Sequence, residues 1–139
     1  MTKEKLLIFL GSIGGLISTL FGGWNAALTT LLMFMAIDYI SGFFIAVVLK
    51  KSPKTKTGAA SSKASFAGLL KKGMILFIVL VAAQLDILSG VNFIKDATII
   101  AFIANETISI IENAGYMGIK VPAVIMKAID VLNSKEGKR

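Results

Sequence analysis

The chain has 139 residues, of which 55% are hydrophobic and 17% are charged, and its formal net charge is +7. Soluble domains carry about 25% charged residues, so this composition favours a single membrane domain, residues 1–139, over a soluble one. Cysteine and histidine are absent, which excludes disulfides and thiolate metal sites and removes the commonest general base; we therefore expect no enzyme activity, no cofactor and no metal.

The first apolar segment, residues 6–23, follows a short start that contains Lys3 and Lys5. A cleaved signal peptide begins in the same way, but Trp24 and Asn25 stand where small residues are needed for cleavage. Small residues that let helices approach closely in lipid lie four apart on one face: Gly11, Gly15 and Thr19. We expect them to pack either within one subunit or between subunits.

The second apolar segment, residues 26–49, has 24 residues and one charge, Asp38. At about 1.5 Å per residue it is long enough to cross a hydrocarbon core of about 30 Å. Gly42 is a further candidate for close helix packing. The sequence therefore predicts a membrane span here.

A basic loop, residues 50–72, separates this span from the next. It contains no acid and seven lysines: Lys50, Lys51, Lys54, Lys56, Lys63, Lys71 and Lys72. Short loops rich in lysine stay on the cytoplasmic side, so these residues set the topology, and contact with anionic lipid is the second interpretation. Residues 64–70 are expected as a short surface segment before the span. Because the lysines lie between apolar runs, nucleic acid is not an expected partner.

Two further spans are predicted, residues 73–94 and residues 97–113. The second is amphipathic, so it either crosses the membrane with its polar side against protein or lies in the interface. The basic C-terminal tail belongs beside the basic loop, which requires an even number of spans. We therefore expect about four spans with both termini cytoplasmic in a bacterial cytoplasmic membrane, with three as the alternative. Residues 121–139 are expected to form an amphipathic helix, starting at Pro122, and a polar tail.

Three carboxylates are predicted in one layer near the middle of the membrane, Asp38, Asp86 and Glu106, with no lysine or arginine at that depth. They are expected to be protonated and hydrogen-bonded as a clasp, or to face water. A functional alternative is a switch that is packed at rest and hydrated when subunits reorganise into a pore. The remaining candidate polar residues of the bundle are Asn105, Ser109 and Glu112.

Two motifs resemble those of the phage-lysis and toxin-secretion holin family. The first, residues 38–42, resembles its Asp-Tyr-x-x-Gly signature and is followed by serine, Gly68 and a lysine pair, 71–72. The second, residues 105–114, resembles its Asn-Glu-x-x-Ser-x-x-Glu-Asn block and is followed by Gly118 and Pro122. The resemblance implies a phage-derived protein that oligomerises with itself and permeabilises the membrane.

The same resemblance implies its partners: membrane lipid, an endolysin or a large toxin that leaves through the opening, and an antiholin. Two other functions remain open from the residues alone. One is a small ion or proton channel that uses the buried carboxylates. The other is an antiholin or membrane scaffold that makes no pore.

Overall fold

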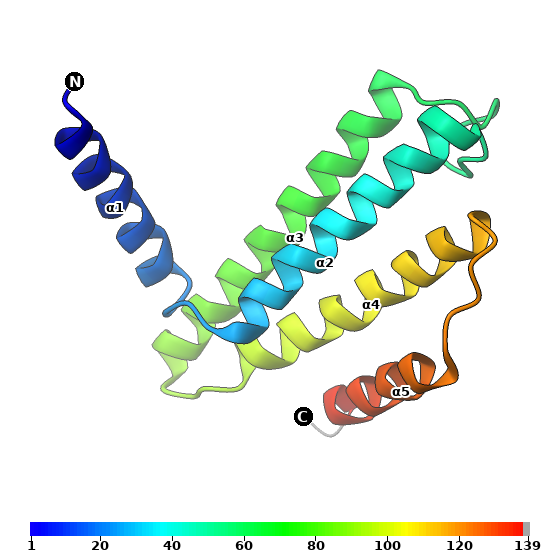
Figure 1. Cartoon of the computed structure of the whole chain (residues 1–139). Helices are drawn as coiled ribbons and strands as arrows, with labels where there is room; N and C mark the ends of the chain where they lie inside the picture. Colours follow the sequence, from blue (N-terminus) through cyan, green and yellow to red (C-terminus); the bar gives the residue numbers. More distant parts are fainter. Residues whose placement is uncertain (138–139) are drawn as a thin grey trace.

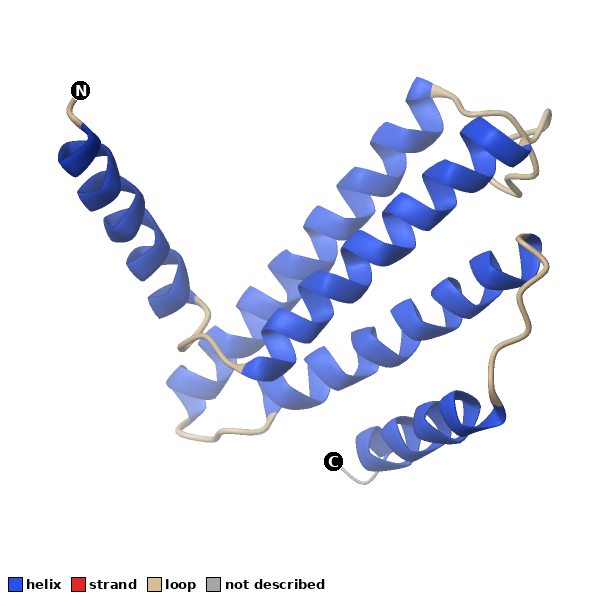
Figure 2. Ribbon diagram, viewed as in Figure 1, coloured by secondary structure: helices blue, strands red, loops and turns tan. Residues whose placement is uncertain are grey.

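The computed structural model describes residues 1–137, and all regular structure within that range is helical. It consists of five α-helices and one π-helical turn that extends the second helix: α1 (Lys3–Leu20), α2 (Ala26–Phe44), η1 (Ile45–Leu49), α3 (Ser62–Ser89), α4 (Ile94–Tyr116) and α5 (Ala123–Gly137). Figure 2 shows the helices joined by loops. The all-helical class predicted from the sequence is confirmed for these residues.

The helices form a three-helix bundle with one helix projecting from it and one folded against it. Figure 1 shows α2, α3 and α4 running along one another, α1 leaving them at an angle, and α5 turning back below α4. The most extensive packing is between α2 and α4, followed by α3 on α4 and α5 on α4. The centre of the molecule therefore lies between α2, α3 and α4.

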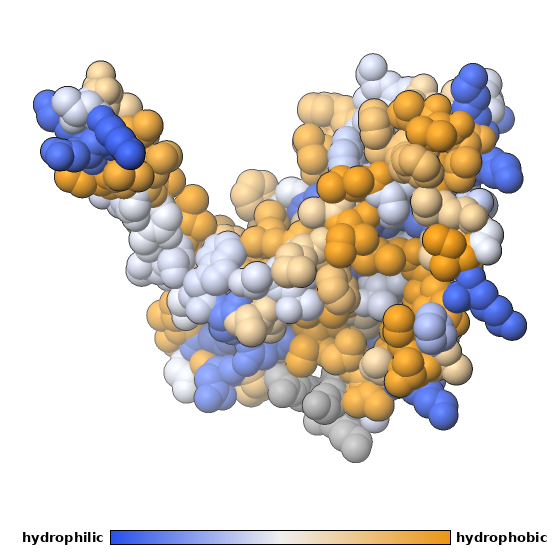
Figure 3. Space-filling view, in the orientation of Figure 1, coloured by the Kyte–Doolittle hydropathy of each residue, from blue (hydrophilic) through white to orange (hydrophobic). Residues whose placement is uncertain are grey.

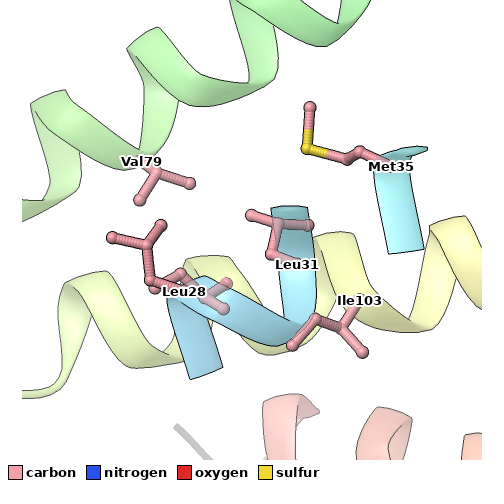
Figure 4. Packing of buried hydrophobic residues seen from close by; sticks show 6 residues of the cluster. Leu28, Leu31, Met35, Val79 and Ile103 are labelled. Carbon is pink, nitrogen blue, oxygen red and sulfur yellow. The ribbon is translucent and has the colours of Figure 1, made fainter. Parts of the chain in front are cut away.

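The hydrophobic core is small and lies where these three helices face one another (Figure 4). Its buried members are Leu28, Leu31, Met35, Val79, Ile99 and Ile103. Leu132 of α5 packs against this cluster from outside. Burial of aliphatic side chains of this kind contributes about 1.5–3 kcal/mol each when it removes them from water.

Most apolar side chains outside the core point outward. Figure 3 shows hydrophobic residues over much of the visible face, with hydrophilic ones gathered toward the outer ends. Two helices, Ala26–Leu49 and Ser62–Ser89, are long and apolar enough to cross a membrane, yet only 28% and 17% of their most apolar windows are buried. A core helix of a soluble protein is mostly buried, so these two favour contact with lipid. The four-span arrangement stays a prediction, because α1 and α4 are not among the helices that are long and apolar enough to count as candidate spans.

Helix α1 makes almost no contact with the rest of the chain. It has no buried residue, and a side chain built at Gly11 or Gly15 would meet nothing within 4 Å. The expected row of small residues therefore does not pack within the subunit. The helix also ends earlier than residue 23, because Gly22 and Gly23 adopt left-handed backbone angles, φ +70° and +98°, that stop it.

The C-terminal end of α1 is the part that is attached to the bundle. The Lys95 ammonium of α4 donates to the carbonyl oxygens of Phe21 and Gly23 at 2.8 and 3.1 Å. The Gln84 side chain of α3 donates to the carbonyl oxygen of Leu20 at 2.8 Å. Carbonyls at the end of a helix lack partners within it, so these side chains satisfy groups that would otherwise be unpaired.

The predicted loop, residues 50–72, is wrong at its C-terminal side. The Ser61 hydroxyl caps α3 by accepting from the Ala64 N–H at 3.0 Å, and the helix then runs without a break from Ser62. The segment expected on the surface, residues 64–70, is thus part of α3, and so are three of the seven lysines: Lys63, Lys71 and Lys72. A cap followed by eleven residues without proline favours a helix over a loop.

The connector that remains, residues 50–61, is folded rather than extended. The Ser52 N–H donates to the Gly58 carbonyl at 2.9 Å, and Ser52 is buried. Gly58 has φ +76°, and a Cβ there would lie 2.1 Å from the carbonyl oxygen of Lys50, so only glycine fits.

The last two helices differ from expectation at their ends. Helix α4 begins at Ile94 and ends at Tyr116, three residues beyond the predicted 97–113 at each side. Helix α5 starts directly after Pro122, as predicted, with Ile129 buried against its neighbours. It continues through Gly137 into the expected tail, and residues 138 and 139 lie outside the described range.

We expect Leu31→Ala to destabilise the bundle strongly. Leu31 is fully buried between the helices, and truncation of such a side chain costs about 2–5 kcal/mol because it leaves a cavity. Thermal unfolding of the purified protein in detergent measures the effect. Leu7→Ala is the matched control, because Leu7 of α1 is 59% exposed; an equal loss of stability in both variants would contradict the observed core.

Candidate functional site

The most highly charged contact in the interior joins α2, α3 and α4 through three ionisable side chains. The Lys72 ammonium of α3 donates to Asp38 Oδ2 of α2 and to Glu106 Oε2 of α4, at 2.5 Å in each case. The lysine lies between the two carboxylates, so one positive charge holds two negative groups from different helices. We refer to Lys72, Asp38 and Glu106 as the ionic triad.

An amide extends the triad along α4 to a second contact with α2. The Asn113 side chain donates to Asp38 Oδ1 at 3.0 Å, to the Asp38 carbonyl at 3.1 Å and to Ser41 Oγ at 2.8 Å. Gly42 lies beside this contact: a Cβ there would lie 3.7 Å from the Asn113 nitrogen, which is an ordinary van der Waals distance. No buried side-chain nitrogen or oxygen in the described part of the chain lacks a hydrogen-bond partner, which is the condition for burying such groups.

The triad is largely shielded from solvent. The side chains of Lys72, Asp38 and Glu106 are 16%, 10% and 3% exposed. Charges removed from water are costly unless they are paired, and removing one partner of a buried pair typically costs about 3–5 kcal/mol. The triad therefore holds the three helices together only while all of its members are present.

The prediction that no lysine reaches the depth of the carboxylates is wrong. The predicted boundaries put Lys72 at the end of the basic loop, directly before the third span, whereas α3 starts ten residues earlier. Lys72 is consequently about 15 Å inside α3 rather than at its end. Asp38 and Glu106 are thus brought together, as expected, but as partners of an ammonium group instead of a neutral clasp.

Asp86 does not join this layer. Its carboxylate accepts from the N–H groups of Ile94 and Lys95, at 2.9 and 3.0 Å, at the opposite end of the bundle. A carboxylate at a helix N-terminus satisfies unpaired N–H groups and interacts favourably with the helix dipole. Asp86 therefore caps α4 and fixes the turn that follows α3.

The other predicted residues lie around the triad. A cleft of about 480 Å³ runs between α3 and α4 and is lined by residues of both helices, by Asp38 and by one loop lysine: Asp38, Lys54, Ala64, Ala67, Gly68, Lys71, Lys72, Ile75, Asn105, Glu106 and Ser109. Asn105 and Ser109 thus flank Glu106 on the cleft side. Glu112 is exposed and does not line it.

Three residues of the site were not singled out from the sequence as its members. Lys72 was assigned to topology, and Ser41 and Asn113 were noted only within motifs. A signal existed for the last two, because Ser41 follows Asp38 by three residues and Asn113 follows Glu106 by seven, which places each pair on one helix face. No sequence spacing of this kind links Lys72 of α3 to Asp38 of α2 or to Glu106 of α4.

The chemistry available here is ionic and structural. In the part of the chain that the structure describes, no three Asp, Glu, His or Cys side chains gather as metal ligands. The triad offers charged groups that attract one another in a largely buried site and become more hydrated if the helices separate.

Comparison with known sequences assigns the chain to a family. The pattern of the bacteriophage holin family matches residues 15–134, which include every residue of the triad and both motifs. The chain belongs to the bacteriophage holin family. This is not an enzyme family, and membership together with the two long apolar helices indicates a membrane protein.

Relatives from bacteria and a phage are similar over most of their length. An uncharacterized protein of Listeria monocytogenes is 38% identical, covering 90% of this chain and 84% of its own. An uncharacterized 14.9 kDa protein of Clostridium perfringens is 37% identical, covering 90% of each chain. A protein of Bacillus phage phi105 named probable holin is 30% identical, covering 81% of this chain and 78% of its own. No solved structure matches the chain.

We expect Lys72→Met to destabilise the bundle far more than Glu106→Gln. The first change leaves two buried carboxylates facing each other, which costs about 3–5 kcal/mol, whereas the second leaves the Lys72–Asp38 pair intact. Thermal unfolding in detergent compares the two.

Lys63→Met is the control for loss of a lysine from the same helix, because Lys63 is exposed. A milder effect of Lys72→Met than of Glu106→Gln would show that the triad is not held by the ammonium group.

Proposed function

We propose that the chain acts as a holin: it oligomerises in a bacterial cytoplasmic membrane and permeabilises it, so that an endolysin reaches the cell wall or a large toxin leaves the cell. Family membership and the relative named probable holin support this proposal. The partners proposed are further copies of the chain, membrane lipid, the released endolysin or toxin, and an antiholin. The structural observation that best supports a holin function is an apolar exterior that surrounds a buried ionic triad.

The proposed topology has four spans and both termini in the cytoplasm. Helices α1 and α4 have 18 and 23 residues, or about 27 and 35 Å, which is close to the thickness of the hydrocarbon core. The lysines of the connector, residues 50–61, favour the cytoplasmic side for this end of the bundle.

The proposed mechanism uses the triad as the switch. At rest, Asp38 and Glu106 are paired with Lys72, and each helix presents apolar side chains outward. When subunits assemble and α2, α3 and α4 separate, the same groups become hydrated and line the opening. Hydration of the separated charges offsets part of the cost of breaking the ion pairs, so it lowers the free energy needed to form an assembly with water at its centre.

A small ion or proton channel is the second candidate function. It is favoured by the cleft of about 480 Å³ that reaches Asp38 and Glu106. A channel of this kind gives graded conductance without release of folded protein. An antiholin or scaffold, the third interpretation, is harmless when produced alone and delays lysis by a related holin.

Expression in a bacterium with a cytoplasmic reporter enzyme tests the proposal. We expect an abrupt loss of membrane potential, followed by escape of the folded reporter only when an endolysin is co-expressed, because the cell wall otherwise retains it. Potential-sensitive dye and extracellular reporter activity measure the two events. Graded, pH-dependent depolarisation without reporter escape would favour the channel, and the absence of both would favour the antiholin.

We expect Asp38→Asn to change the time of membrane opening while the protein still inserts and accumulates. The substitution removes one of the two charges held by Lys72 but keeps the shape of the side chain. The onset of depolarisation, normalised to the amount of membrane-inserted protein, measures it. Asp130→Asn on the exposed face of α5 is the control; onset of depolarisation as in the wild type for Asp38→Asn would remove Asp38 from the switch.

A further inference from the structure

The cleft between α3 and α4 carries one surplus positive charge. Three ammonium groups and two carboxylates line it, those of Lys54, Lys71 and Lys72 and those of Asp38 and Glu106. Lys72 is bonded to both carboxylates, and these are the ion pairs present among the described residues. The surplus therefore resides on Lys54 and Lys71, which face the same space.

Lys54 is held over the cleft by the fold of the connector. Its N–H donates to Ser52 Oγ at 3.2 Å, and Ser52 is itself buried and bonded to Gly58. The Lys54 ammonium lies 3.8 Å from the position of a Cβ on Gly42 of α2. The side chain thus reaches inward across the end of the bundle.

Lys71 lies near the level at which lipid headgroups meet the apolar part of α3. Exposed apolar side chains on this helix extend from Phe66 to Leu88, which is about 33 Å along the axis. Lys71 is five residues inside that band, or about 7.5 Å from its edge, within reach of the headgroup region for a long lysine side chain. Small residues on its face, Ala64, Ala67 and Gly68, leave room beside it.

We propose that this cleft binds the headgroup of a monoanionic phospholipid that carries hydroxyl groups, of the phosphatidylglycerol type. The phosphate lies between Lys54 and Lys71 and balances the surplus charge. The headgroup hydroxyls reach Asn105 and Ser109, which offer donors and acceptors on the α4 side. Basic pockets between membrane helices recognise anionic headgroups in this manner, and Ile75 and the apolar surface of α3 suit the adjoining acyl chain. The proposal requires membrane location but not pore formation.

The test measures lipid binding to the purified full-length protein in neutral detergent. Phosphatidylglycerol or phosphatidylcholine is titrated, bound lipid is counted by native mass spectrometry, and the shift in unfolding temperature is recorded. We expect phosphatidylglycerol to bind in preference to phosphatidylcholine. The double variant Lys54→Gln/Lys71→Gln is expected to bind it about 30-fold more weakly, because two lysine–phosphate contacts are lost.

Two further variants separate the site from general surface charge. Lys56→Gln/Lys63→Gln has the same net charge, affects lysines outside the cleft, and is expected to bind like the wild type. Lys54→Arg/Lys71→Arg keeps both charges and is expected to retain binding, and an unfolding temperature of the lipid-free glutamine variant close to that of the wild type shows that its loss of binding is not misfolding. Equal binding by both glutamine variants, or no preference for phosphatidylglycerol, overturns the proposal.

Two ligands distinguish the source and nature of the headgroup. Soluble glycerophosphoglycerol carries the same phosphodiester and headgroup without acyl chains and is expected to give no shift at concentrations at which the lipid saturates. An equal shift would overturn the assignment to lipid. Phosphatidylserine, which has one net negative charge but no headgroup hydroxyl, is expected to bind more weakly, and equal binding would overturn the hydroxylated class.

Discussion

The bonds from the Lys72 ammonium to Asp38 and Glu106 are the contact on which the bundle depends. Apolar side chains do not drive helices together in lipid, since lipid tails are as apolar as the side chains themselves. Polar contacts and close packing therefore decide which helix faces meet. Here a single ammonium group sets the register of α2, α3 and α4 at once, and Asn113 repeats the link between α4 and α2.

The opposite end of the bundle is held by a second set of polar contacts with another role. Asp86 caps α4, while Lys95 and Gln84 hold the carbonyls at the end of α1. These contacts define the turns and attach α1, whose own apolar surface remains uncovered by the chain. The protein thus has a bundle whose three helices are joined by the ionic triad. It also has one apolar helix, α1, that is available to contact lipid or another subunit.

The sequence determined those features that depend on neighbours along the chain. Apolar runs of sufficient length predicted the helices, Pro122 located the start of α5, and the Asp-Tyr-x-x-Gly and Glu-Asn motifs pointed to the holin family. Asp38 and Glu106 were recognisable as site candidates because a carboxylate is costly within an apolar segment wherever that segment packs. Local patterns suffice for such inferences.

Only the tertiary structure decided the partner of these carboxylates. Lys71 and Lys72 stand next to an apolar run and resemble a boundary, but Ser61 starts α3 early enough to carry Lys72 into the bundle. Asp86, another carboxylate in an apolar segment, bonds instead to the start of α4. The physical reason is that pairing depends on how antiparallel helices align across tens of residues, which the distance from a charge along one helix does not specify.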